Sequence, residues 1–81
     1  MWYNIPMVNV HFQRKIAGDE LRETLFFATG NRVEKLKTPE FVTLRVPNFV
    51  VKIKHFKHIT VNDDVCRSVS EAKYVIQELI R

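Results

Sequence analysis

The chain has 81 residues, a formal net charge of +4 and 46% hydrophobic residues, with only 2 Gly and 3 Pro, which excludes disordered and fibrous proteins. Its length allows one domain, residues 1–81, that buries about 60 to 65% of the surface exposed by the unfolded chain. A single Cys66 excludes an intramolecular disulfide, and no apolar run has the length of a signal peptide or a membrane span, so the sequence predicts a soluble, cytoplasmic protein.

The first predicted element is a strand at residues 7–13. Val8, Val10 and Phe12 occupy alternate positions there, which is the two-residue period of a strand with one buried face. Pro6 marks the start of this strand, because proline has no backbone N–H to donate.

A helix is predicted next, at residues 18–30, the segment GDELRETLFFATG. Asp19 and Glu20 favour its first turn, and Gly30 can adopt the left-handed conformation that ends many helices. One face of this helix is apolar and consists of Leu21, Leu25 and Ala28.

A β-hairpin follows, in which two apolar rows flank the turn signal PN. The rows are Val42, Leu44 and Val46 on one strand and Phe49, Val51 and Ile53 on the other. Placing both rows on one face pairs Leu44 with Val51. Because the fixed φ of proline excludes the primed two-residue turns, we expect a four-residue loop, Val46 to Phe49, built on a type I turn. The segment 32–38 is predicted as a short edge strand before this hairpin.

The opposite face of the hairpin combines basic and aromatic side chains. By alternation it carries Phe41, Thr43, Arg45, Val50, Lys52, Lys54 and Phe56. In this register Phe41 lies across from Lys54, where a cation and an aromatic ring can interact. His55 falls on the core side, opposite Glu40, and we expect it to have a structural role there.

Two continuations are open after this hairpin. Either residues 59–61 return as a third antiparallel strand through a turn at Lys57 and His58, or the second hairpin strand continues to Val61. Both place Ile59 on the apolar face, and the excessive length of a single strand favours the turn.

A C-terminal helix is predicted after the capping-box segment SVSE, in which Ser68 caps the backbone and Glu71 reaches back. Its apolar arc consists of Val69, Ala72, Val75, Ile76, Leu79 and Ile80, and Tyr74 points away from that arc. The predicted fold is therefore a small α+β domain with two helices and a three- to five-stranded, mostly antiparallel sheet, in β-α-β-β-β-α order. This order of elements is similar to that of double-stranded RNA-binding domains and ribosome-hibernation domains.

Catalytic and metal chemistry have weak support in the sequence. His55 and His58 face opposite sides of an extended strand, so we expect no metal site. Asp63 and Asp64 are typical of a turn introduced by Asn62, and Cys66 of a small buried thiol, although a thiol nucleophile can be imagined there. No Walker loop, Rossmann fingerprint, GXXG loop or RNP1 motif is present. We therefore predict a non-enzymatic protein without a cofactor.

Basic residues concentrate in the middle of the chain, where residues 32–58 contain 7 Lys and Arg against 2 Asp and Glu, an excess of +5. A local positive electrostatic field of this kind favours binding of nucleic acid, with RNA preferred, or of an acidic protein partner. The predicted nucleic-acid-binding residues are Arg45, Lys52, Lys54, Phe56, Lys57 and His58. The cations would neutralise phosphates and the ring would stack on a base. The alternative is a solvated sheet face whose lysines prevent aggregation.

A second functional hypothesis is a protein-interaction module, such as a small inhibitor or adaptor that covers a protein partner. It rests on surplus apolar surface at Trp2, Phe26, Phe27 and Tyr74. Because 81 residues supply a small core, we expect a homodimer that associates through Phe26 or Phe27.

Overall fold

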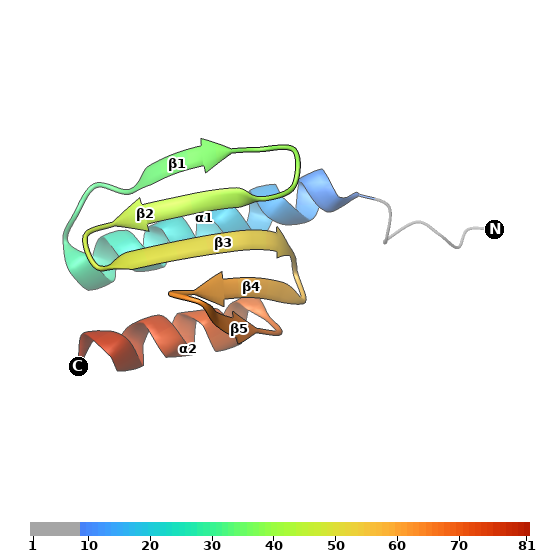
Figure 1. Ribbon diagram of the computed structural model, residues 1–81. Coiled ribbons are helices and arrows are strands. Elements are labelled where there is room, and N and C mark those ends of the chain that lie inside the picture. Colours follow the sequence, from blue (N-terminus) through green and yellow to red (C-terminus); the bar gives the residue numbers. More distant parts are fainter. Residues whose placement is uncertain (1–8) are drawn as a thin grey trace.

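A five-stranded antiparallel sheet forms one layer of the protein, and two helices cover one of its faces (Figure 1). The computed structural model describes residues 9–81. Its elements are α1 (Val10–Thr29), β1 (Glu34–Lys37), β2 (Val42–Val46), β3 (Phe49–His55), β4 (His58–Val61), β5 (Asp64–Cys66) and α2 (Val69–Ile80). The predicted α+β class, with two helices and an antiparallel sheet, is confirmed.

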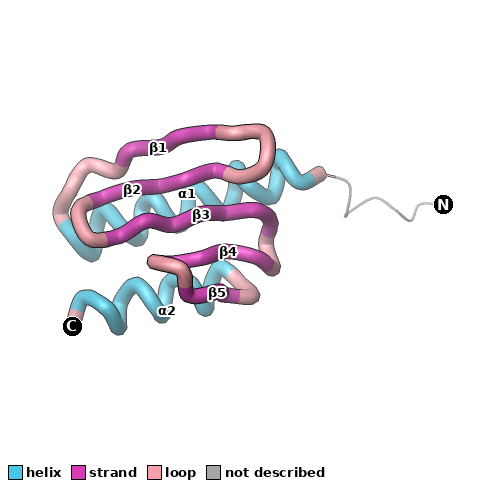
Figure 2. The backbone as a smooth tube through the Cα atoms, in the orientation of Figure 1, coloured by secondary structure: helices cyan, strands magenta, loops and turns pink. Residues whose placement is uncertain are grey.

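The strands lie in the sheet in the order in which they follow in the sequence, joined by short connections (Figure 2). Leu44 pairs with Val51, which in turn pairs with Val61, so one apolar row crosses the three central strands. The predicted hairpin register is therefore correct. The predicted edge strand also forms, as β1, and β4 is the third antiparallel strand expected after a turn.

The core lies between this inner sheet face and the two helices. Leu21 and Leu25 of α1 and Ile76 of α2 are fully buried against the same rows of Val, Leu and Ile side chains. Burial of each such side chain contributes about 1.5 to 3 kcal/mol, and truncation to alanine costs about 2 to 5 kcal/mol. Because both helices share this one core, the opposite face of the sheet carries neither of them.

The predicted first strand was wrong over the described residues. Val10 to Gln13 form the first turn of α1, whose N-cap is Asn9: its side chain accepts a hydrogen bond from the Phe12 N–H at 2.8 Å. Residues 7 and 8 lie outside the described part of the chain. The helix therefore starts eight residues before Gly18, and Asp19 lies in its middle instead of its first turn. Gly30 has the expected left-handed conformation, with φ 73°.

The turn between β2 and β3 was also predicted wrongly. Val46 and Phe49 are paired strand residues, so the loop contains two residues and not four. Asn48 has a φ of 74°, and a proline followed by a residue with positive φ is the combination found in type II turns. Pro47 excludes the primed turns, as expected, but its fixed negative φ is compatible with a type II turn.

A buried arginine connects α1 to the strand ends. Arg14 is only 8% exposed, and its guanidinium donates to the carbonyl oxygens of Lys54 (2.9 Å), Pro39 (3.1 Å) and Glu40. These three bonds hold the loop before β2 and the end of β3 against the same helix. They fix the geometry of the sheet end at which Lys54 lies.

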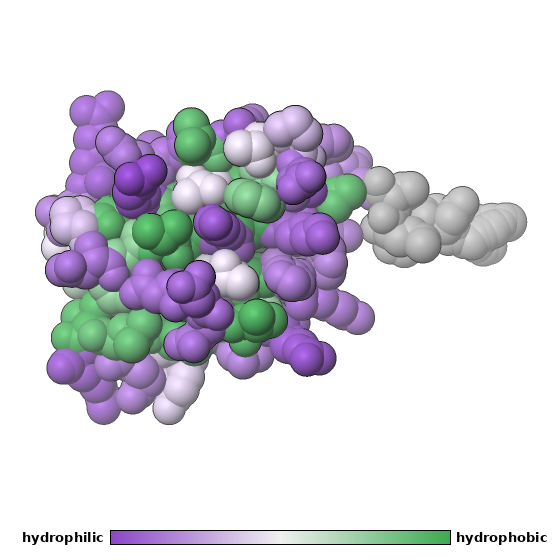
Figure 3. All heavy atoms as spheres, viewed as in Figure 1, coloured by the Kyte–Doolittle hydropathy of each residue, from purple (hydrophilic) through white to green (hydrophobic). Residues whose placement is uncertain are grey.

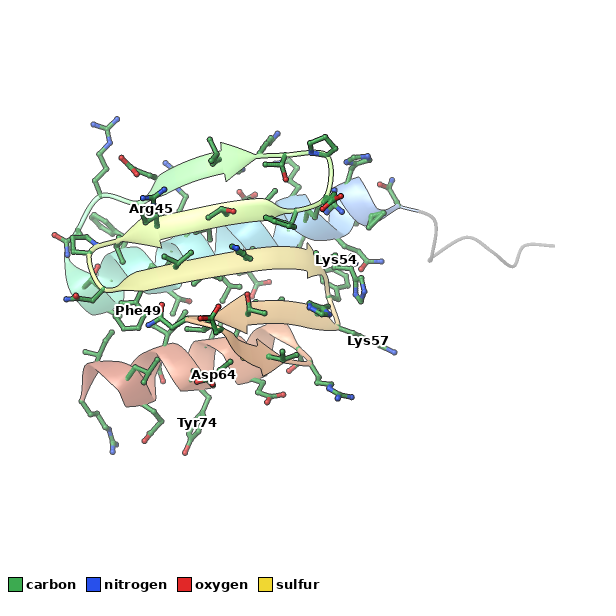
Figure 4. The ribbon with its side chains drawn as sticks, viewed as in Figure 1. Arg45, Phe49, Lys54, Lys57, Asp64 and Tyr74 are labelled. Atoms are coloured by element: carbon green, nitrogen blue, oxygen red, sulfur yellow. The ribbon has the colours of Figure 1, made fainter. Side chains whose placement is uncertain are left out.

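The α2 start has the predicted Ser68 cap, and Glu71 reaches back as expected, but to the residue before the cap instead of to Ser68. Ser68 accepts a hydrogen bond from the Glu71 N–H, and the Glu71 carboxylate accepts one from the Arg67 N–H. Tyr74 is exposed and points away from the sheet, as predicted (Figure 4).

Candidate nucleic-acid interface

The outer sheet face, defined here by Phe41, Thr43, Arg45, Val50, Lys52, Lys54, His58 and Thr60, is the candidate interface. Lys52 pairs with Thr43 on one side and with Thr60 on the other, so these three side chains form a row across β2, β3 and β4. No described helix covers this row. In Figure 3 hydrophilic residues extend across this face, with hydrophobic ones between them.

An aromatic ring lies beside a lysine on this face. The Lys52 Nζ is 5.3 Å from the centre of the Phe41 ring, within cation–π range. The sequence predicted Lys54 as the partner of this ring. The observed contact is with the next outward-facing lysine, on the diagonal, because a long lysine side chain reaches that far across a strand pair.

A shallow pocket of about 200 Å³ joins these groups. It is lined by Glu40, Phe41, Lys52, Lys54, His58 and Thr60. Three of the predicted binding residues, Lys52, Lys54 and His58, therefore come together around the Phe41 ring. The Glu40 carboxylate at the same pocket reduces the local positive charge.

The remaining predicted cations lie apart from this pocket. Arg45 lies toward one end of the sheet and Lys54 toward the other, while Lys57 extends from the turn between β3 and β4 (Figure 4). The Arg45 Nε is 4.0 Å from the Glu34 carboxylate, and both side chains are largely exposed. An exposed pair of this length contributes little to stability, so Arg45 can exchange its partner for a phosphate.

The predicted position of Phe56 on the outer face of a strand is wrong. Phe56 belongs to the turn between His55 and His58 and not to a strand, and its ring packs partly buried against the core. The β3–β4 register shifts between Ile53 and His55, which breaks the alternation on which the prediction relied. Phe41 is therefore the ring that accompanies the lysines on the outer face.

The sequence predicted that His55 and His58 face opposite sides of a strand, and this is wrong. They face each other across a two-residue turn, with ring centres 6.1 Å apart, and the His55 Nδ1 accepts a hydrogen bond from the Lys57 N–H. His55 is half-buried at this turn instead of within the core. Among residues 9–81, no group of three or more His, Cys, Asp or Glu side chains is placed to hold a metal ion.

Cys66 is a buried thiol at the end of β5. Burial raises its pKa, and the nearby Glu71 and Asp64 carboxylates raise it further. Its sulfur lies 3.8 Å from the Asp64 carbonyl oxygen. A higher pKa leaves less thiolate at neutral pH, which is the opposite of what a thiol nucleophile needs. Asn62 and Asp63, with φ of 48° and 77°, form the turn before β5, and Asp64 begins the strand.

One cationic surface was not predicted from the sequence. Lys35 pairs with Leu44 and Lys37 with Val42, so these lysines stand on the inner side of β1, next to the apolar rows. There they line a small pocket together with His11, Arg14 and Lys15 of α1. The pairing of β1 with β2 shows which side chains of β1 face inward. The helix beside them was not expected, because residues 7–13 were predicted to form a strand.

Apolar side chains are exposed near the C-terminal ends of the two helices. Phe27 is 75% exposed and Phe26 49% exposed, and their rings pack edge to face. Leu79 and Ile80 are also exposed, in the last turn of α2. The helices run in the same direction, so these four residues lie toward the same end of the molecule (Figure 1). Trp2 lies outside the described residues.

No protein-family model matches the chain, and the comparisons with curated proteins and with solved structures found no match either. In the part of the chain that the structure describes, neither helix has the length and apolar character needed to cross a membrane.

Proposed function

We propose that this protein is a non-enzymatic nucleic-acid-binding domain, with RNA as the preferred ligand, and that the outer sheet face is its binding surface. One observation carries the proposal: Lys52, Lys54 and His58 line one pocket with Phe41, whose ring Lys52 contacts, on a sheet face that no described helix covers. Cytoplasmic action remains a prediction from the sequence.

Each part of this surface has a chemical task in binding. Lys52, Lys54 and Arg45 neutralise phosphates, and the release of condensed counterions then favours binding. Phe41 offers a ring on which an unpaired base can stack, beside a lysine that reaches the adjacent phosphate. Phosphate contacts of this kind position the ligand without reading its sequence. Binding with little sequence preference therefore follows.

A direct titration tests this proposal. Labelled single- and double-stranded RNA and DNA are titrated with the protein at about 50 mM and about 200 mM salt, because electrostatic binding falls steeply across this range. We expect binding at low salt, a loss of at least about tenfold at high salt, and tighter binding of RNA than of DNA. Absence of binding to all four ligands at low salt contradicts the proposal.

The second candidate function is association with a protein, in the first instance with another copy of this chain. The observation that favours it is the exposed Phe26 and Phe27 pair of α1, with Leu79 and Ile80 of α2 also exposed toward the same end of the helix layer. Burial of these side chains in a homodimer enlarges a core that is small in a chain of this length.

Light scattering at micromolar concentration tests this association. We expect a dimer that Phe27→Ser dissociates, because serine cannot contribute to an apolar interface. Phe12→Ser is the matched control, since Phe12 is similarly exposed but lies near the opposite end of α1. A wild-type protein that is monomeric throughout removes the second candidate.

A further inference from the structure

A second cationic site lies on the other side of β1 from the outer sheet face. A pocket of about 90 Å³ opens between the first half of α1 and β1, with space for a group of phosphate size. Its lining consists of His11, Arg14, Lys15, Lys35, Lys37, Thr38 and Val42. Five of these residues carry cationic or protonatable side chains, and none is a carboxylate.

The sheet register explains why two lysines stand there. The apolar rows of the inner face cross the sheet and end at β1, where Lys37 takes the position beside Val42 and Lys35 the position beside Leu44. The core rows are covered by α1, but β1 is exposed along its whole length. The lysine ammonium groups therefore face an open space and not the core.

Arg14 adds a buried charge to the lining of this pocket. Its guanidinium carries five N–H donors, and its three bonds to backbone carbonyls use one each. Within residues 9–81, all of these acceptors are neutral carbonyl oxygens, so the charge of this buried group has no carboxylate partner. An anion in the pocket would compensate it.

The only carboxylate that pairs with a described lysine of this pocket is at its rim. Lys15 lies 3.4 Å from Asp19, and both side chains are more than half exposed, so this pair is weak. The Thr38 hydroxyl is already engaged with the backbone of Phe41. Lys35, Lys37 and Arg14 therefore retain three positive charges that no described carboxylate neutralises.

We propose that this pocket binds a phosphate group. Lys35, Lys37 and His11 donate to its oxygens, and the field of Arg14 stabilises its charge. The phosphate belongs either to the backbone of a nucleic acid that also contacts the outer face or to a free phosphorylated small molecule. The pocket itself does not depend on the proposed function of the outer face.

The test uses pyrophosphate as the probe and follows backbone amide shifts of the full-length chain at low ionic strength. We expect saturable shifts confined to residues 11–15 and 35–38. The variant Lys35→Gln, Lys37→Gln raises the dissociation constant by about tenfold or more, because two charge-assisted contacts are lost. Its matched control is Lys52→Gln, Lys54→Gln, which removes the same charge from the outer face and changes the constant by less than about twofold.

Three results overturn the proposal: no saturable shift in the wild type, shifts spread evenly over all basic surfaces, or an equal loss in both double variants. The wild-type shift pattern locates the site even if a variant folds poorly.

A second titration, with single-stranded RNA in place of pyrophosphate, shows whether the phosphate belongs to a nucleic acid or to a free small molecule. If both double variants weaken RNA binding, the pocket holds a backbone phosphate. If only the outer-face variant does so, the pocket holds a free phosphorylated molecule. A protein that binds pyrophosphate here but binds no nucleic acid upholds the pocket and contradicts the proposed function.

Discussion

The Arg14 Nε donates a hydrogen bond to the Lys54 carbonyl oxygen at 2.9 Å, and this contact ties the candidate interface to the helix layer. The same guanidinium holds the carbonyls of Pro39 and Glu40, which immediately precede Phe41. A single buried side chain of α1 thus positions both the ring and one of the lysines of the outer sheet face.

Replacement of Arg14 is therefore expected to destabilise the fold. Arg14→Met leaves three carbonyl oxygens without their donor and should lower the free energy of unfolding by about 2 to 4 kcal/mol. The measurement is urea denaturation. Arg22→Met, at an exposed position of the same helix, is the control and should change stability by less than about 0.5 kcal/mol. Equal midpoints for the two variants would show that the three hydrogen bonds contribute little.

The two glycines predict stability changes of opposite sign. Gly18 is helical and buried, and a Cβ added there meets Val42 and Ile53 at 4.0 Å, an ordinary van der Waals distance. Gly18→Ala should stabilise the protein by about 0.5 to 1 kcal/mol, because alanine loses less backbone entropy in a helix. Gly30→Ala should destabilise it by about 1 kcal/mol or more, since φ is positive there. Thermal unfolding of the two variants measures both changes. A melting temperature of Gly18→Ala below that of the wild type would show that there is no space for a Cβ at this position.

The raised pKa of Cys66 predicts a pH dependence at alkaline pH. The folded protein holds the thiol proton more tightly than the unfolded chain, so the stabilisation is complete below the ordinary pKa of 9.0 and is lost as pH rises past it. We expect the free energy of unfolding to fall more steeply with pH in the wild type than in Cys66→Ala. An aromatic disulfide reagent should also react more slowly with folded than with urea-unfolded protein. Identical slopes and rates would mean that the thiol is accessible.

The position of Phe41 distinguishes two modes of RNA binding. If its ring stacks on an unpaired base, Phe41→Ala should weaken binding of single strands by about 1 to 3 kcal/mol and affect a duplex much less. Phe12→Ala, on α1, is the control. An equal effect of Phe41→Ala on single strands and duplexes would rule out stacking.

Much of the sheet was predictable because alternation is a local signal. The pairing of Leu44 with Val51 follows from two matched apolar rows, and the structure has the same register. The start of α1 was not predictable in this way. Val10 and Phe12 fit a strand-like alternation but belong to the first turn of a helix, and Gly18 resembles a helix boundary although it lies in mid-helix.

The candidate interface was predictable only where the strands remain regular. Lys52 and Arg45 are on the expected face, whereas Phe56 and His55 lie beyond the register shift that follows Ile53. A shift of one position reverses the direction of the side chains that follow it in the same strand. The pocket of Lys35 and Lys37 required knowledge of which helix passes beside β1, and that is a tertiary contact that no local pattern contains.

The most direct test of nucleic-acid binding compares two charge variants that carry the same net charge. Lys52→Gln, Lys54→Gln and the control Arg67→Gln, Arg81→Gln each remove two cations, the second pair from the ends of α2. We expect the outer-face variant to lose at least about tenfold in affinity for single-stranded RNA at low salt and to reduce the slope of log K against log[salt] by about 1 to 2, while the control changes little. If the control loses as much affinity as the outer-face variant, or if both bind like the wild type, the outer sheet face is not the nucleic-acid-binding surface.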